Sequence, residues 1–204
     1  MDTRTDIELI TEYLAGNSRA FDTIVLRHTR SIFAFVYRLS SGHADTADIV
    51  QDTFVKAWKH AKRFKVSETS NDRAFQTWLF AIARNTTIDW FRKKKATPFS
   101  AIDEWSDTHA ENGDERGITD TIADTEPLAH ELFEKEENVQ IIEKALETLS
   151  LHERSIILLH NYEELTFEDV AEILDIPMNT VKSKYRRALE KLKQIIERMH
   201  QNRP

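Results

Sequence analysis

Residues 165–188 read LTFEDVAEILDIPMNTVKSKYRRA, and this stretch decides the fold of the C-terminal part of the chain. Val170, Ala171 and Leu174 give a short segment of helical periodicity, and a longer periodic segment follows the break Asp175-Ile-Pro-Met. A short helix, a tight turn and a longer helix make a helix-turn-helix. Such turns often carry glycine, but aspartate also tolerates a left-handed backbone better than most residues. The stretch therefore predicts a helix-turn-helix with Asp175 in its turn.

The last predicted helix has a basic face opposite its apolar stripe. Residues 182–198 hold seven basic and two acidic side chains. Lysine and arginine attract phosphates, a bidentate arginine reads guanine, and serine bonds to several base edges. The pattern favours insertion into a major groove, and the alternative is a solvated basic face. The candidate residues are Asn179 and Thr180, one of which is expected to cap the helix, followed by Lys182, Ser183, Arg186 and Arg187.

Helical periodicity also covers the rest of the chain outside one central stretch. Capping boxes at Thr5–Glu8 and Ser150–Glu153 mark two helix starts, and Asn17 or Ser18 can cap a third helix. Four glycines, 40% apolar residues and 31% charged residues favour helices over sheets. We therefore expect an all-α protein.

The helix expected from about Asp45 has two unlike faces. Its apolar stripe is expected to face the core and consists of Ala47, Val50, Phe54, Val55 and Trp58. The opposite face is polar and carries Asp48, Gln51 and Asp52.

A later helix, from Phe75 to about Trp90, ends in the basic run at residues 92–95. Basic and aromatic side chains on one helix can bind unpaired bases, although the basic run would also complement the negative end of the helix dipole. Trp90 belongs to the core stripe, so Trp78 is the better candidate for stacking.

The central stretch, residues 96–137, holds thirteen acidic and two basic residues, a net charge of −11 in a chain of −7. It lacks a sustained apolar period and holds half of the glycines and prolines. We therefore predict a first domain at 1–95, a flexible acidic linker at 96–137 and a second domain at 138–204.

Two long motifs carry a family resemblance. DTADIVQDTFVKAW at residues 45–58 and FQTWLFAIARNTTIDWFR at residues 75–92 resemble region 2 of the extracytoplasmic-function sigma factors. Residues 149–192 are similar to region 4 of the same family. The resemblance implies a region 2 helical bundle and a region 4 helix-turn-helix. It also implies a protein that directs bacterial RNA polymerase core enzyme to promoters, recognises −10 and −35 elements and assists melting.

The resemblance assigns roles residue by residue. Asp48, Gln51 and Asp52 are expected to contact the polymerase, although Ala47 stands where many relatives have an acid, and a solvated face with an Asp52–Lys56 pair is the alternative. The basic face of the last helix is expected to read the −35 element. The −10 element is assigned to Ser70, Asn71, Asp72, Trp78, Arg84, Asn85, Arg92 and Lys93. Asn85 would hold a flipped base, since its amide both donates and accepts.

The acidic linker has two possible roles. In relatives this segment threads toward the RNA exit path, where a chain of net −11 could substitute for nucleic acid in a basic channel. The alternative is a plain tether, in which the acids keep the linker soluble and extended.

Other functions find little support. No cysteine is present, so thiol-based sensing within this chain is excluded, and the resemblance adds an anti-sigma factor to the expected partners, promoter DNA and polymerase. We expect no cofactor, metal, small-molecule substrate or membrane insertion, and a cytoplasmic protein that is not an enzyme. The competing classes are a DNA-binding repressor and an enzyme with a metal held by Asp45, Asp48 and Asp52.

Overall fold

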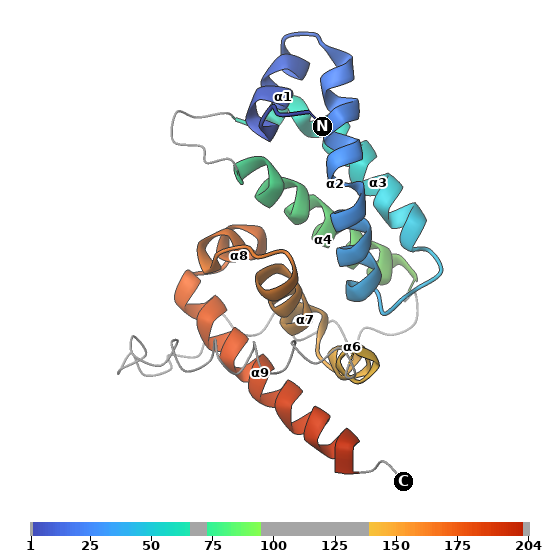
Figure 1. Ribbon diagram of the computed structural model, residues 1–204, viewed down its shortest axis with the longest axis vertical. Helices are drawn as coiled ribbons and strands as arrows, with labels where there is room; N and C mark the ends of the chain where they lie inside the picture. The colour runs from blue at the N-terminus through green and yellow to red at the C-terminus, as the bar shows by residue number, and fades with distance from the viewer. Residues whose placement is uncertain (1, 66–72, 95–138, 202–204) are drawn as a thin grey trace.

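The computed structural model describes residues 2–65, 73–94 and 139–201, and every regular element in these ranges is a helix (Figure 1). The all-α prediction is therefore confirmed. The predicted linker, together with Ser70, Asn71 and Asp72 of the −10 assignment, lies outside the described residues. The N-terminal half contains α1 (Asp6–Leu14), α2 (Ser18–Leu39), α3 (Thr46–His60), a 3-10 turn (Ala61–Arg63) and α4 (Ala74–Lys94). The C-terminal half contains α6 (Val139–Glu147), α7 (Leu151–Ile157), a π-helical segment (Leu158–Tyr162), α8 (Phe167–Leu174) and α9 (Met178–Gln201).

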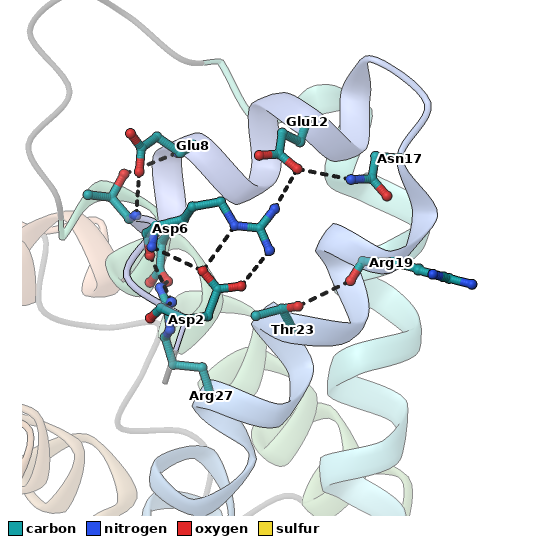
Figure 2. Close-up of polar contacts among 10 residues, drawn as sticks. Asp2, Asp6, Glu8, Glu12, Asn17, Arg19, Thr23 and Arg27 are labelled. Carbon is teal, nitrogen blue, oxygen red and sulfur yellow. Dashed lines mark hydrogen bonds and ion pairs between the residues drawn. The ribbon is translucent and has the colours of Figure 1, made fainter.

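Helix starts follow the predicted capping chemistry. Both predicted capping boxes are present, at α1 and at α7. A third box opens α8, where Thr166 pairs with an aspartate rather than the usual glutamate or glutamine. Asn17 stands at the N-cap of α2 but makes no side-chain cap, and its amide nitrogen donates to Glu12 (Figure 2).

Two helix ends require a left-handed backbone. Asp175 closes α8 at φ 54° and ψ 45°, as the sequence predicts, and its N–H donates to the carbonyls of Ala171 and Glu172. After α2, Ser41 and Gly42 both have positive φ. A Cβ at Gly42 would lie 3.1 Å from the Tyr37 hydroxyl oxygen, so only glycine fits this turn without displacing the ring.

The N-terminal half buries the carboxylate of Asp6 beside its aliphatic core. Asp6 at the start of α1 lies 2.6 Å from His28 Nε2 on α2. Asp6 also accepts a bond of 2.6 Å from Arg27 (Figure 2). Both Asp6 and His28 are buried. Burial raises the pKa of Asp6, but hydrogen bonds from His28 and Arg27 outweigh it, so the net pKa is lowered. The pair fixes α1 against α2 without leaving a lone buried charge.

The predicted apolar stripe of α3 is partly wrong. The residues of α3 that face the core are Thr46, Ile49, Val50, Thr53 and Ala57. Ala47 is exposed, and Val55 and Trp58 are 38% and 54% exposed. Threonine hydroxyls satisfied within the helix take core positions, as at Thr53, which donates to the Ile49 carbonyl at 2.8 Å. The prediction therefore holds for Val50, which is buried, and for Phe54, which is half-buried against the core, and is wrong for Ala47, Val55 and Trp58.

The two halves pack directly against each other. In Figure 1, α7 and α8 lie beside α4, and the contacts confirm that α4 packs on α8 while α2 packs on α7 and the π-helical segment. α4 is consequently buried on two faces, by α2 and α3 on one side and by the C-terminal half on the other. This arrangement decides which of the predicted site residues are accessible.

Candidate nucleic-acid interface

The reading face of α9 is set by its buried stripe. Val181, Tyr185, Ala188 and Leu192 are buried against α6, α7 and α8. With that face fixed, Arg186 and Arg187 project into solvent, and Lys182 and Ser183 are half-buried beside them. The sequence-predicted residues of α9 are therefore brought together on one side of a single helix.

Local contacts orient the side chains of this face. Lys182 Nζ lies 6.0 Å from the centre of the Phe167 ring on α8, and the Ser183 hydroxyl donates to the Thr180 carbonyl at 3.0 Å. Arg186 Nε is 3.6 Å from Glu190, one turn further along α9. α9 begins at Met178, so Asn179 and Thr180 lie within its first turn, and the prediction that one of them caps the helix from outside is wrong.

Arg84 and Asn85 on α4 form a hydrogen-bonded pair with opposite exposure. Arg84 is 2% exposed, whereas Asn85 is exposed. Arg84 Nη1 donates to Asn85 Oδ1 at 3.1 Å, which directs the amide oxygen inward and leaves the amide hydrogens outward. Burial lowers the pKa of Arg84 to about 10. The predicted phosphate contact of Arg84 thus requires the C-terminal half to move away.

Trp78 lies in an aromatic cluster rather than alone. Its ring centre is 5.4 Å from those of Phe64 and Phe75, and its side chain is half-buried. Toward the other end of α4, Arg92 and Lys93 are exposed, and Arg92 donates to Asp89 at 3.0 Å. These two cations are accessible to a DNA backbone as α4 stands.

A cluster at the end of α4 is not among the sequence-predicted sites. Lys94 Nζ lies 2.8 Å from Asp45 and 4.5 Å from the centre of the Trp90 ring, while His43 packs edge-on against Trp90 at 4.6 Å. The hydrogen bond from Lys94 lowers the pKa of Asp45. These contacts anchor the basic end of α4 to the start of α3. Lys94 is 49 residues from Asp45 along the chain, so no local pattern signals the pair.

The exposed face of α3 carries both acidic and apolar side chains. Asp48, Gln51 and Asp52 are all exposed, as the sequence predicts. Val55 and Trp58 extend this face, since Val55 follows Asp52 by three residues and Trp58 follows Gln51 by seven. Lys56 does not pair with Asp52: its Nζ lies 3.1 Å from Thr86 and 3.9 Å from Asp89 on α4. The alternative of a local Asp52–Lys56 pair is therefore wrong.

Neither a metal cluster nor a membrane span occurs in the part of the chain that the structure describes. No three histidine or carboxylate side chains there gather as metal ligands. Asp45, one member of the weighed metal set, pairs with Lys94 instead. None of the described helices is long and apolar enough to cross a membrane.

Comparison with known families and proteins agrees with this geometry. The models of sigma-70 region 2 and sigma-70 region 4 match residues 24–97 and 139–192. The ECF RNA polymerase sigma-E factors of Salmonella typhimurium and Escherichia coli K12 are each 32% identical over 188 residues, 91% of this chain and of the relative. The sigma-E factor of Haemophilus influenzae is 28% identical over 193 residues, 95% of this chain and 96% of its own length.

Solved structures show the same fold. The sigma factor RpoE of Bartonella quintana, crystallised with the anti-sigma factor NepR, is 28% identical with a TM-score of 0.59, covering 87% of this chain and 96% of that one. CnrH in complex with the cytosolic domain of CnrY is 23% identical with a TM-score of 0.63, covering 94% and 97%. Both sigma-70 regions match this chain, and its relatives are 32% identical over 91% of its length. The chain therefore belongs to the sigma-70 family and, within it, to the extracytoplasmic-function RNA polymerase sigma factors.

Proposed function

We propose that this sigma factor carries out promoter-specific transcription initiation with RNA polymerase through three separate surfaces. The observation that carries the proposal is the exposed basic face of α9, the second helix of the helix-turn-helix, whose opposite side is a fully buried stripe. Arg186 and Arg187 are free to enter a major groove, where a bidentate arginine contact to guanine discriminates by about 1–3 kcal/mol. Asn179, Thr180, Lys182 and Ser183 would complete −35 recognition.

The second surface is the exposed edge of α4. The outward amide hydrogens of Asn85 suit the acceptor groups of an extruded base, and Trp78 offers the uncovered part of its ring for stacking. Arg92 and Lys93 would follow the DNA backbone beyond this point. Arg84 joins them once it is uncovered.

The third surface is the exposed face of α3. It carries the exposed acids Asp48 and Asp52 and, further along α3, the exposed side chains of Val55 and Trp58, so charged and apolar groups are combined on it. This is the composition of an interface hot spot with a steering rim. We assign this face to polymerase core enzyme.

The remaining assignments follow from this function. The chain would act as a regulator without catalysis of its own, in the cytoplasm where promoter DNA and polymerase are found. Because the RpoE relative was crystallised with an anti-sigma factor, an anti-sigma factor is the expected regulator of this chain. The division into domains at 1–95 and 138–204, with an acidic linker at 96–137 acting in the RNA path or as a tether, remains our proposal.

Run-off transcription with purified core polymerase tests the function directly. Templates are genomic fragments that the reconstituted holoenzyme retains at moderate salt. A sigma factor yields discrete transcripts only when both proteins are present. A repressor would instead bind its operator without polymerase and yield no transcript, which would overturn the proposal.

A further inference from the structure

A basic surface at the end of α3 belongs to none of the three surfaces described above. Its members are exposed cations in the last turn of α3 and in the 3-10 turn and the residues after it: Lys59, Lys62, Arg63 and Lys65. Four cations therefore stand within seven residues of a chain whose net charge is −7. Within the ranges that the structure describes, none of the four makes an ion pair. This α3-end basic surface thus carries charge that the described fold does not neutralise.

The ordinary role of cations at a helix end accounts for only part of the α3-end basic surface. Lys59 lies in the last turn of α3, where it complements the negative end of the helix dipole. Lys62, Arg63 and Lys65 lie beyond that helix. The acids of α3 do not neutralise them either, because Asp52 precedes Lys59 by seven residues, or about 10 Å along the helix axis. At physiological salt, charges that far apart on a surface are largely screened from each other.

The 3-10 turn holds two of these cations outward on a fixed backbone. Ala61 at its start is fully buried, and the Phe64 N–H donates to the Ala61 carbonyl at 3.0 Å. The Phe64 ring is half-buried, with its centre 5.4 Å from that of Trp78. Lys62 and Arg63 lie between these two anchored residues and are exposed. The backbone beneath the two cations is therefore ordered before any ligand binds.

The contact between Phe64 and Trp78 places the α3-end basic surface beside one end of the exposed edge of α4. Arg92 and Lys93 are exposed at the other end of α4, and Asn85 lies between the two ends. Trp78 and Arg92 are 14 residues apart, which is about 21 Å along the helix. A DNA strand with one phosphate about every 3.4 Å crosses this distance in about six nucleotides. The edge of α4 is thus flanked by exposed cations at both ends.

We propose that the α3-end basic surface binds phosphates of the unpaired promoter strand, on the side of the extruded base that lies away from Arg92 and Lys93. The proposal rests on the proposed function, because it takes the exposed edge of α4 as the −10 surface. Cations that follow the backbone and aromatic rings that stack on bases are the two components of a single-strand binding site. Lys62 and Arg63 supply the backbone contacts at the Trp78 end, so the strand is held on both sides of Asn85. The partner is single-stranded DNA, and phosphate contacts position it without reading sequence.

A matched pair of double variants tests this assignment in the holoenzyme. Lys62→Gln with Arg63→Gln removes two charges from the α3-end basic surface. The control, Arg30→Gln with Lys144→Gln, removes two charges from exposed positions on α2 and α6 that belong to no assigned surface. Each protein is assembled with saturating core polymerase and titrated with a fluorescent single-stranded −10 oligonucleotide from a promoter that the wild type transcribes.

The loss of two phosphate contacts should be visible in both affinity and salt dependence. K62Q/R63Q should bind the oligonucleotide about twenty-fold more weakly at about 0.1 M salt, and the slope of log K against log salt should be shallower by about 1.4. The control variant should keep the wild-type affinity and slope. A wild-type slope in K62Q/R63Q overturns the proposal.

Oligonucleotides with single neutral methylphosphonate linkages locate the contact along the strand. The wild-type holoenzyme should lose affinity when a linkage bound by Lys62 or Arg63 is neutral, and K62Q/R63Q should be insensitive to that change. Arg92→Gln with Lys93→Gln should become insensitive at linkages on the opposite side of the extruded base. If the two double variants lose sensitivity at the same linkages, or at none, the strand is not held at both ends and the proposal is wrong.

Two further measurements separate the DNA contact from other roles of these cations. Affinity for core polymerase, titrated without DNA, should be equal in K62Q/R63Q and the wild type, and a loss there with unchanged oligonucleotide binding would make the surface a polymerase contact instead. Lys62→Arg with Arg63→Lys keeps both charges and should keep the wild-type slope, whereas a loss of slope would refute a charge contact. Run-off transcription by the wild type tests the sigma function separately, so transcripts from the wild type together with an unchanged slope in K62Q/R63Q refute this inference alone.

Discussion

Arg84 holds the amide of Asn85 by a 3.1 Å hydrogen bond from its Nη1 to the Asn85 side-chain oxygen. The buried residue thereby orients its exposed neighbour and turns the amide hydrogens toward solvent. The carbonyl oxygen and the NH₂ group of the Asn85 side chain therefore have separate roles. The oxygen serves Arg84, and the NH₂ group is available for a base.

Asn85→Asp should therefore fail almost as severely as Asn85→Ala. The aspartate keeps the acceptor for Arg84 but cannot donate to an extruded base, so we expect each variant to lose about 1–3 kcal/mol in open-complex formation. Permanganate reactivity of unpaired thymines measures the loss. Gln194→Ala, which removes another exposed helical amide, is the matched control. If N85D melts promoters like Q194A, Asn85 is only a surface amide.

Arg187→Ala should weaken −35 duplex binding and relax preference at one base pair, because it removes a groove contact without touching the core. The expected cost is about 1–3 kcal/mol, measured by fluorescence anisotropy against a panel of substituted duplexes. Arg198→Ala removes the same charge about 16 Å further along α9, since a helix rises 1.5 Å per residue. A uniform loss over all sequences, equal in both variants, would reduce Arg187 to a nonspecific charge.

Reversing Asp48 and Asp52 to lysine should weaken binding to core polymerase by about 2 kcal/mol or more, through like-charge contacts at the interface. Glu168 and Glu172 on α8 are exposed at the same i, i+4 spacing, so their double reversal to lysine changes the net charge equally. Affinity is measured by labelled-core titration without DNA. Equal losses in the two double variants would assign the effect to overall charge.

Trp58→Ala should lower core affinity by about 2 kcal/mol, or roughly thirty-fold, while changing unfolding free energy by less than about 0.5 kcal/mol. The reason is its position: the side chain is 54% exposed on α3 and contributes little to the core. Leu14→Ala, an exposed apolar truncation on α1, serves as control. A large loss of thermal stability in W58A would show that Trp58 packs in the core and does not act as an interface residue.

The exposure of Trp58 could not be predicted from the sequence, whereas other features of the fold could. Helix positions, two capping boxes and the left-handed Asp175 were predictable because they depend on local chemistry. Which side of α3 faces the core was not predictable, because the core side carries Thr46, Thr53 and Ala57 while the exposed side carries Trp58. On α3 the usual pattern is inverted, because threonines face the core and a tryptophan faces solvent.

The burial of Arg84 could not be predicted from the sequence either. Periodicity places Arg84 on the polar side of α4, opposite Leu79 and Phe75, and the family motif places it against DNA. Only the tertiary contact with the C-terminal half covers it. The Lys94–Asp45 anchor is missed for the same reason, since long-range pairs leave no local pattern.

Two half-buried groups near the interface, Glu163 and His152, should give opposing pH dependences. Burial raises the pKa of Glu163 to about 7, against the lowering effect of Arg38, so stability falls as pH rises from about 4.5 to about 7. The pKa of His152 is lowered to about 4, so stability falls as pH drops from about 6.5 to about 4. The two slopes oppose each other where the windows overlap.

Single substitutions should separate these slopes in thermal melts. Glu163→Gln should be more stable than wild type at pH 8 and equal to it near pH 4.5, whereas His152→Gln should lose the acid-side decline below pH 6.5. For a chain of this size, each kcal/mol corresponds to about 2–4 °C in Tm. Parallel curves for all three proteins would show that neither group is desolvated in solution.

The four bonds of Arg154 divide evenly between the halves, two to Glu147 and Leu149 and two to Leu39 and Ser41. Glu147 is the last residue of α6 and Leu39 is the last residue of α2. One cation therefore stabilises the carboxyl ends of two helices that belong to different halves of the chain.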